Sequence, residues 1–78
     1  MNYRSGEEAR LGDEVLLGDT EFGVVVCSPD TDEFSADYPR KEWQGLGRGI
    51  LVRFENLGLI HYIESEEALV LLRRTGKN

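Results

Sequence analysis

The pair of residues best suited to covalent chemistry in this chain is Cys27 with His61, because a thiol and an imidazole base form the reactive centre of many hydrolases. They are the single cysteine and the single histidine of the 78 residues. Cys27 follows Val26 in an apolar run, where a free cysteine is usually buried and inert. No loop typical of an oxyanion hole accompanies it. We therefore predict a structural thiol, a surface histidine and no enzymatic activity.

A metal site has no better support in the sequence. One cysteine and one histidine exclude a Cys/His zinc site within one chain. Asp30 and Asp32 alternate as in a calcium loop, but Phe34 and Lys41 stand at the fifth and twelfth positions, where such loops need oxygen ligands. The Gly-x-x-x-x-Gly-Lys phosphate loop is also missing from the sequence. We expect no metal and no cofactor.

The connection 30–43 combines aromatic rings with carboxylates and is the strongest candidate for a binding surface. Aromatic side chains presented on a loop often dominate the energetics of protein interfaces. Carboxylates beside them favour a cationic partner group. The alternative is that the rings pack onto one end of a small domain and complete its core. The predicted partner-binding residues are Asp30, Asp32, Glu33, Phe34, Tyr38 and Trp43.

Short apolar runs separated by Gly, Asp and Pro turns must position this connection. They predict strands over 14–17, 22–28, 50–54 and 69–73, with one more strand starting at 59. Pro29 ends the second strand, because it cannot donate to a strand ladder. Segment 39–45 begins with Pro and ends with Gly, which predicts one short helix. Ser65 is placed to cap a helical turn over 65–68.

Residues 56–58 fit a three-residue hairpin loop with Gly58 in the left-handed conformation. That loop would place His61 opposite Arg53 on the outer face of the sheet. A neighbouring cation disfavours imidazolium, so we expect His61 to be neutral at pH 7.

The same register puts apolar residues on the outer face, which suits a homodimer through Leu51, Leu59 and Ile63. Coverage of that face by the long connection or by residues 1–10 is the alternative, and the sequence does not separate the two.

The order of these features resembles the SH3-like barrel, in its KOW and Tudor branches. The features are the Gly12-Asp13-x-Val15 opening, the Gly23-x-Val25 second strand, the tight third hairpin, the acidic turn and the Leu-rich last strand. The resemblance implies an all-β, five-stranded barrel over 11–74 that binds a partner, with an N-terminal arm (1–10) and a C-terminal tail (75–78). The chain is also similar to small uncharacterised bacterial proteins of this type.

The charge balance narrows the choice of partner. Fifteen acidic and nine basic residues give a net charge of −6, which disfavours phosphate backbones and favours a basic protein through electrostatic steering. A free thiol, no export signal and no apolar run of about 18 residues indicate a cytoplasmic protein. We expect a non-enzymatic protein-binding module. The alternatives are an immunity or inhibitor protein for a toxin, and a KOW-like nucleic-acid accessory using Arg40, Lys41, Arg48 and Arg53.

Overall fold

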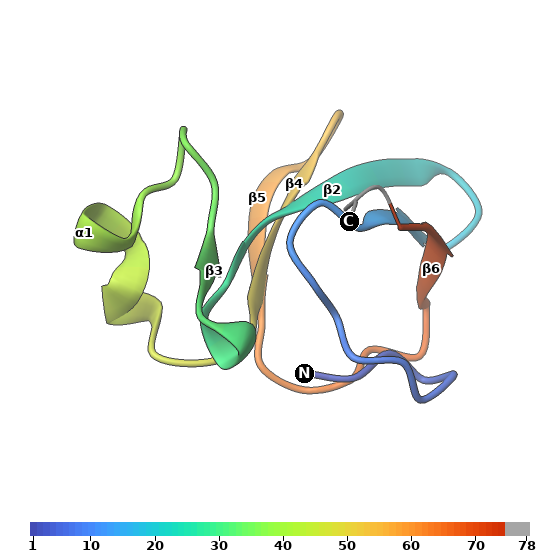
Figure 1. The fold of residues 1–78 in the computed structure, drawn as a ribbon. Helices are drawn as coiled ribbons and strands as arrows, with labels where there is room; N and C mark the ends of the chain where they lie inside the picture. Colours follow the sequence, from blue (N-terminus) through green and yellow to red (C-terminus); the bar gives the residue numbers. More distant parts are fainter. Residues whose placement is uncertain (75–78) are drawn as a thin grey trace.

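The computed structural model describes residues 1–74 and shows one strongly curved antiparallel sheet (Figure 1). Five of its six strands follow the order β5-β4-β2-β1-β6, and the short β3 pairs with the end of β2. The strands are β1 (Glu14–Leu17), β2 (Glu21–Ser28), β3 (Glu33–Phe34), β4 (Ile50–Phe54), β5 (Gly58–Tyr62) and β6 (Leu69–Arg73). The helical pieces between β2 and β4 are η1 (Pro29–Thr31), α1 (Arg40–Trp43) and η2 (Gln44–Leu46).

The predicted all-β class is confirmed, but the sheet is open and is not the closed five-stranded barrel that we expected. β5 and β6 form its two ends and do not pair with each other in the described chain. In Figure 1 the first ten residues and the segment after β5 pass between these ends. The hydroxyl of Ser65 donates to the carbonyl of Asn2 there. Ser65 therefore does not cap a helix. Residues 67–68 form a turn that is not helical, in place of the predicted helical turn over 65–68.

The main core fills the concave side of the sheet. Its buried members come from every long strand except β5 and from the first ten residues: Tyr3, Ala9, Val15, Val25, Ile50, Val52, Phe54 and Leu69. β-branched side chains dominate the strand positions because they pack well on a pleated surface. Gly23 leaves room for a ring here, since a Cβ at this position would lie 2.7 Å from Cδ1 of Phe54.

Residues 1–10 form part of the domain and not a separate arm. The side chains of Tyr3 and Ala9 are 2% and 0% exposed and contact the main core. A small loop closed by the Asn2–Glu8 bridge holds both in place. The predicted tail 75–78 lies outside the described residues.

A second, smaller core lies on the opposite side of the sheet, beneath the connection from β2 to β4. Its buried members are Val26, Cys27 and Leu51, and half-buried side chains of the connection pack on them. A bulge at Val26, between the Val25 and Cys27 pairings with β4, turns β2 toward this side. The helix predicted over 39–45 is present as α1 followed by η2.

The β4–β5 hairpin shows where the predicted register was wrong. Gly58 is left-handed, as expected, with φ of +80°. However, Leu59 pairs with Arg53 and His61 pairs with Leu51, two residues away from the predicted pairing. A shift of two residues keeps each side chain on its predicted face. Ile60 and Tyr62 therefore still contact the main core, but His61 is not opposite Arg53.

Candidate functional site

The carboxylates of the connection already have cationic partners within the chain. Asp30 pairs with the amino group of Met1. Asp32 pairs with Arg40, and both of those side chains are largely exposed. Glu33 pairs with Arg10. The three acids predicted to attract a basic partner are thus compensated, which weakens the charge they present to another protein.

Glu33 is the most firmly held of the three. Arg10 approaches its two oxygens with Nε at 2.9 Å and Nη2 at 3.0 Å. Thr31 Oγ1 and the backbone N–H of Leu11 also donate to it, at 2.6 Å and 3.1 Å. The hydrogen bond from Arg10 is the main reason why the pKa of Glu33 falls to about 2. This side chain ties the connection to the start of the domain.

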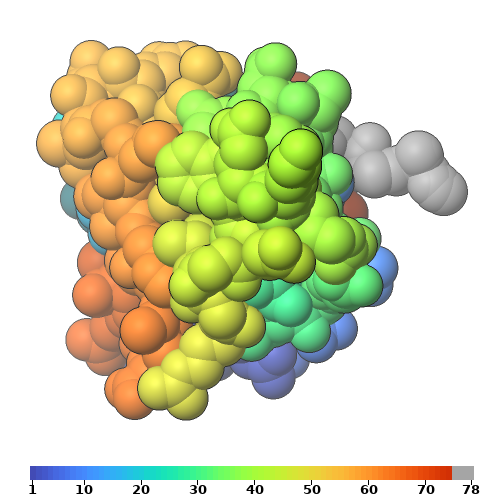
Figure 2. All heavy atoms as spheres, turned by 90° about the vertical axis from the view of Figure 1, so that its left-hand side faces the viewer, coloured from blue at the N-terminus to red at the C-terminus, as the bar shows by residue number. Residues whose placement is uncertain are grey.

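The rings of the connection pack inward, as the alternative interpretation held. Tyr38 and Trp43 lie 5.2 Å apart between ring centroids, and Phe34 carries the guanidinium of Arg40 at 4.8 Å. All three rings are half-buried on the second core. Figure 2 shows the connection, green to yellow, spread over this side of the molecule. A shallow hollow of about 510 Å³ remains between Leu11 and Arg40.

Cys27 and His61 are not brought together. In the register of the sheet, Leu51 of β4 stands between them, so their backbones lie two strands, about 10 Å, apart. The Cys27 thiol is fully buried and donates to the carbonyl of Tyr38 at 3.4 Å. Burial raises its pKa above the usual value. His61 Nε2 lies 2.7 Å from the carbonyl of Arg48 and therefore carries a proton.

The described residues also lack a metal-binding cluster. Nowhere in residues 1–74 do three His, Cys, Asp or Glu side chains converge as metal ligands would. Over the same range, the helices are all too short and too polar to span a bilayer.

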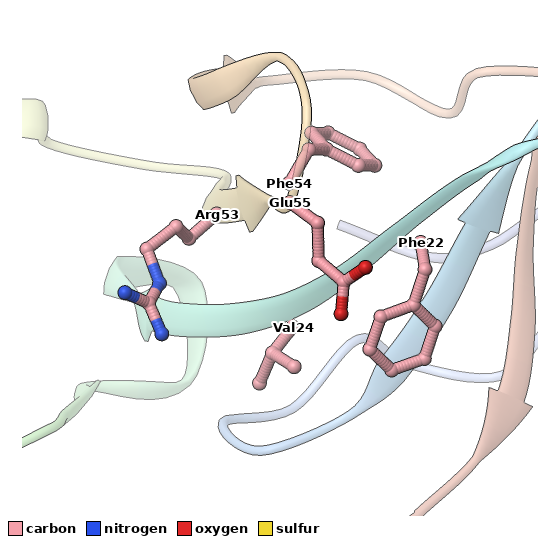
Figure 3. Close-up of a pocket in the computed structure, with 5 residues that line it drawn as sticks. All are labelled: Phe22, Val24, Arg53, Phe54 and Glu55. Atoms are coloured by element: carbon pink, nitrogen blue, oxygen red, sulfur yellow. The ribbon is translucent and has the colours of Figure 1, made fainter.

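A different surface, on the convex side of the sheet, has the better geometry for binding. Phe22 and Val24 of β2 form the floor of a hollow of about 300 Å³, and Arg53 and Glu55 stand at its rim (Figure 3). Phe54 also lines it, although its ring turns away into the main core. Within residues 1–74, neither Arg53 nor Glu55 has an ion-pair partner. The hollow thus offers an apolar floor with one uncompensated charge of each sign.

The apolar surface continues from this hollow across β1 to β6. Leu16 pairs with both Phe22 and Val70, so the three side chains form one row over three strands. Val70 and Leu72 are 50% and 49% exposed. We call Leu16, Phe22, Val24, Val70 and Leu72 the outer-face patch. An antiparallel sheet normally turns polar side chains to water on its free face, so this patch is a candidate binding surface.

Of the three residues of the expected dimer surface, one is buried and two are exposed. Leu51 is only 3% exposed, because the connection covers it. Leu59 and Ile63 remain 42% and 43% exposed. Of the three residues, the connection therefore covers only Leu51.

In comparisons with protein-family models, curated proteins and solved structures, no family, protein or structure matches this chain. Its function therefore has to be inferred from the geometry of its own surfaces.

The sequence did contain a signal for the outer-face patch. The run Val24-Val25-Val26 is apolar without alternation, and a strand with that pattern is covered on both faces. From this run we predicted only a strand over 22–28. The sequence could not predict that Arg53 and Glu55 lack ion-pair partners, because ion pairing depends on which charged residues the fold brings together.

Proposed function

We propose that this chain is a small non-enzymatic protein-binding module whose partner docks on the outer-face patch. The observation that supports it most is the hollow over Phe22 and Val24, with Arg53 and Glu55 unpaired at its rim. A partner that inserts an apolar side chain, offers a carboxylate to Arg53 and offers a cation to Glu55 satisfies these features. The net charge of −6 favours a partner with an overall positive charge, which steers the encounter.

The connection is the competing surface for the same function. Its rings help to form the second core and its predicted acids are paired within the chain. We therefore place the partner on the outer-face patch and keep the connection as the comparison in the test. Arg40, one of four cations needed by a nucleic-acid accessory, is engaged by Asp32, and this favours a protein partner.

We also propose that the fold is an open form of the SH3-like barrel. The strand order β5-β4-β2-β1-β6, in which the last strand pairs with the first, supports this assignment. The long connection after β2 adds the second core to that plan.

The test compares three immobilised proteins in quantitative capture from a lysate of the source organism. They are the native chain, an outer-face variant (Phe22→Ser with Arg53→Ser) and a connection variant (Asp32→Lys with Asp37→Lys). All three must show the same circular dichroism spectrum. We expect a protein that binds the native chain and the connection variant, is lost with the outer-face variant, and binds less well as salt rises. Loss with the connection variant alone would move the site to the connection, and equal capture by all three would refute the proposed surface.

A further inference from the structure

The outer edge of β5 offers unpaired backbone groups. Within the described chain, β5 pairs with β4 alone. The N–H of Glu55, just after β4, donates to Phe22 of β2 at 3.0 Å. Backbone direction alternates along a strand, so Arg53 also points toward β2, and its opposite residue Leu59 points away from β4. The backbone N–H and C=O groups of Leu59 and His61 are thus directed outward at the edge.

This edge carries none of the charges, prolines or bulges that often prevent pairing between sheets. Segment 57–63, Leu-Gly-Leu-Ile-His-Tyr-Ile, holds no proline, lysine or acidic residue. Its register with β4 is continuous, whereas a shift between Glu14 and Val15 disturbs the pairing of the other end strand, β6. Of the large apolar side chains exposed in residues 1–74, Leu57, Leu59 and Ile63 lie on or beside β5. Figure 2 shows the β4–β5 hairpin, in light to deep orange, at the surface beside the connection.

The edge is also complementary to itself. Leu57 and Ile63 stand three residues before and after Ile60, and Leu59 and His61 stand one residue before and after it. If two copies pair antiparallel about a two-fold axis at Ile60, Leu59 faces the partner's His61. Leu57, in the turn before β5, then comes to the same end of the pairing as the partner's Ile63, just after β5. The first pair occurs twice and supplies four backbone hydrogen bonds.

Charge does not oppose this arrangement at the edge. The paired strand Gly58–Tyr62 holds no acidic residue, so no acid stands opposite an acid along it. A register shifted by one residue in either direction would move the two-fold axis and separate Leu57 from the partner's Ile63.

We propose that two copies of this chain form a dimer by antiparallel pairing of their β5 strands about Ile60. The occupant of the edge is a second copy because the exposed apolar residues match under a two-fold operation, which an unrelated strand has no reason to satisfy. The dimer joins two sheets into one and removes their exposed β5 edges. It does not depend on the outer-face patch as a binding site.

Sedimentation equilibrium of the native chain against two charge variants tests the proposal. The positive variant carries Leu57→Lys with Ile63→Lys, and the negative variant carries Leu57→Glu with Ile63→Glu. Each variant places like charges opposite each other at both ends of the pairing, so the dimer dissociation constant should rise about tenfold or more. Mixing the two variants should restore dimers, now mixed, because lysine then faces glutamate.

The matched control is Val70→Lys with Leu72→Lys, which charges two equally exposed apolar residues of β6. We expect it to dimerise like the native chain. Hydrogen exchange adds a residue-specific readout: the amides of Leu59 and His61 should become protected as the protein concentration rises. A native chain that stays monomeric up to about 1 mM, a dimer lost only in the β6 control, or mixed variants that fail to pair would each overturn the proposal.

Discussion

The hydroxyl of Tyr3 donates a hydrogen bond of 2.7 Å to the buried carboxylate of Asp13. The same carboxylate accepts from the backbone N–H of Arg10 at 2.9 Å and from Arg74 Nε at 3.0 Å. Tyr3, the turn over 10–13 and Arg74, which is 61 residues further along the chain, therefore meet at one fully buried acid. Burial and this acceptor raise the pKa of Tyr3 well above its ordinary value. The contact explains why residues 1–10 are part of the domain.

Removing either partner should weaken the fold. We expect Tyr3→Phe to lower the free energy of unfolding by about 1–3 kcal/mol, because a buried acceptor loses its donor. Asp13→Ala should lower it by about 2–4 kcal/mol, since it leaves the Tyr3 hydroxyl and the Arg10 amide without an acceptor. Urea denaturation measures both. Ser5→Ala, at an exposed position, serves as the control, and a Tyr3→Phe variant as stable as this control would contradict the assigned role of the network.

Gly49 should tolerate no side chain. Its φ is +86°, and a Cβ would overlap the carbonyl oxygen of Tyr62 at the start of the β4–β5 pairing. We expect Gly49→Ala to destabilise the protein by about 3 kcal/mol or more. Gly45→Ala is the matched control, because nothing lies within 4 Å of its Cβ position, and it should change the stability by less than about 0.5 kcal/mol. Equal melting temperatures for the two variants would contradict this reading of the backbone.

The ion pair of Glu33 with Arg10 should make the stability depend on acidity. The pKa of Glu33 is lowered from 4.5 to about 2 in the folded state. A lowered pKa gives stability that is fully present above pH 4.5 and is lost as the pH falls toward 2. Because both side chains are partly exposed, we expect about 1 kcal/mol at neutral pH.

A double-mutant cycle with Glu33→Gln and Arg10→Gln isolates this contribution. The coupling energy between the two positions should be present at pH 7 and should fall steeply as the pH approaches 2, where half of the Glu33 carboxylates are protonated. A coupling that stays constant over this range would show that the pair contributes nothing through its charge.

The local elements could be predicted from the sequence because their signals are local. The runs at Glu14–Leu17 and Leu69–Arg73 and the left-handed Gly58 depend on β-propensity and turn chemistry, and the structure confirms all three. The hairpin register depended on the loop type, and an error of two residues preserved every side-chain face.

The parts that could not be predicted depend on contacts between distant segments. Tyr3 and Arg74 both donate to the Asp13 carboxylate, and no local sequence signal predicts that these three residues meet. The partners of Asp32 and Glu33 come from α1 and from the start of the domain. A sequence shows the charge of a carboxylate but not the cation that the fold places beside it. The three acids of the predicted binding surface were therefore expected to be free for a partner, although each is paired within the chain.

The thiol of Cys27 should report whether the connection stays packed. It is fully buried, and Trp43 and Tyr38 are among the half-buried residues packed on its cluster. In the native chain, a thiol reagent should react only when the connection opens, so the rate should be far below that of a free thiol. Trp43→Ala removes part of the cover and should make this opening easier.

We expect Trp43→Ala to accelerate the reaction about tenfold or more, because the loss of about 1.4 kcal/mol of local packing raises the open population by that factor. Lys41→Ala, an exposed change in the same helix, should leave the rate unchanged and is the control. If the ring instead serves mainly to contact a partner, its removal will alter neither the rate nor the unfolding free energy. Equal rates for native chain and Trp43→Ala would therefore return Trp43 to the set of candidate interface residues and would reopen the connection as the binding surface.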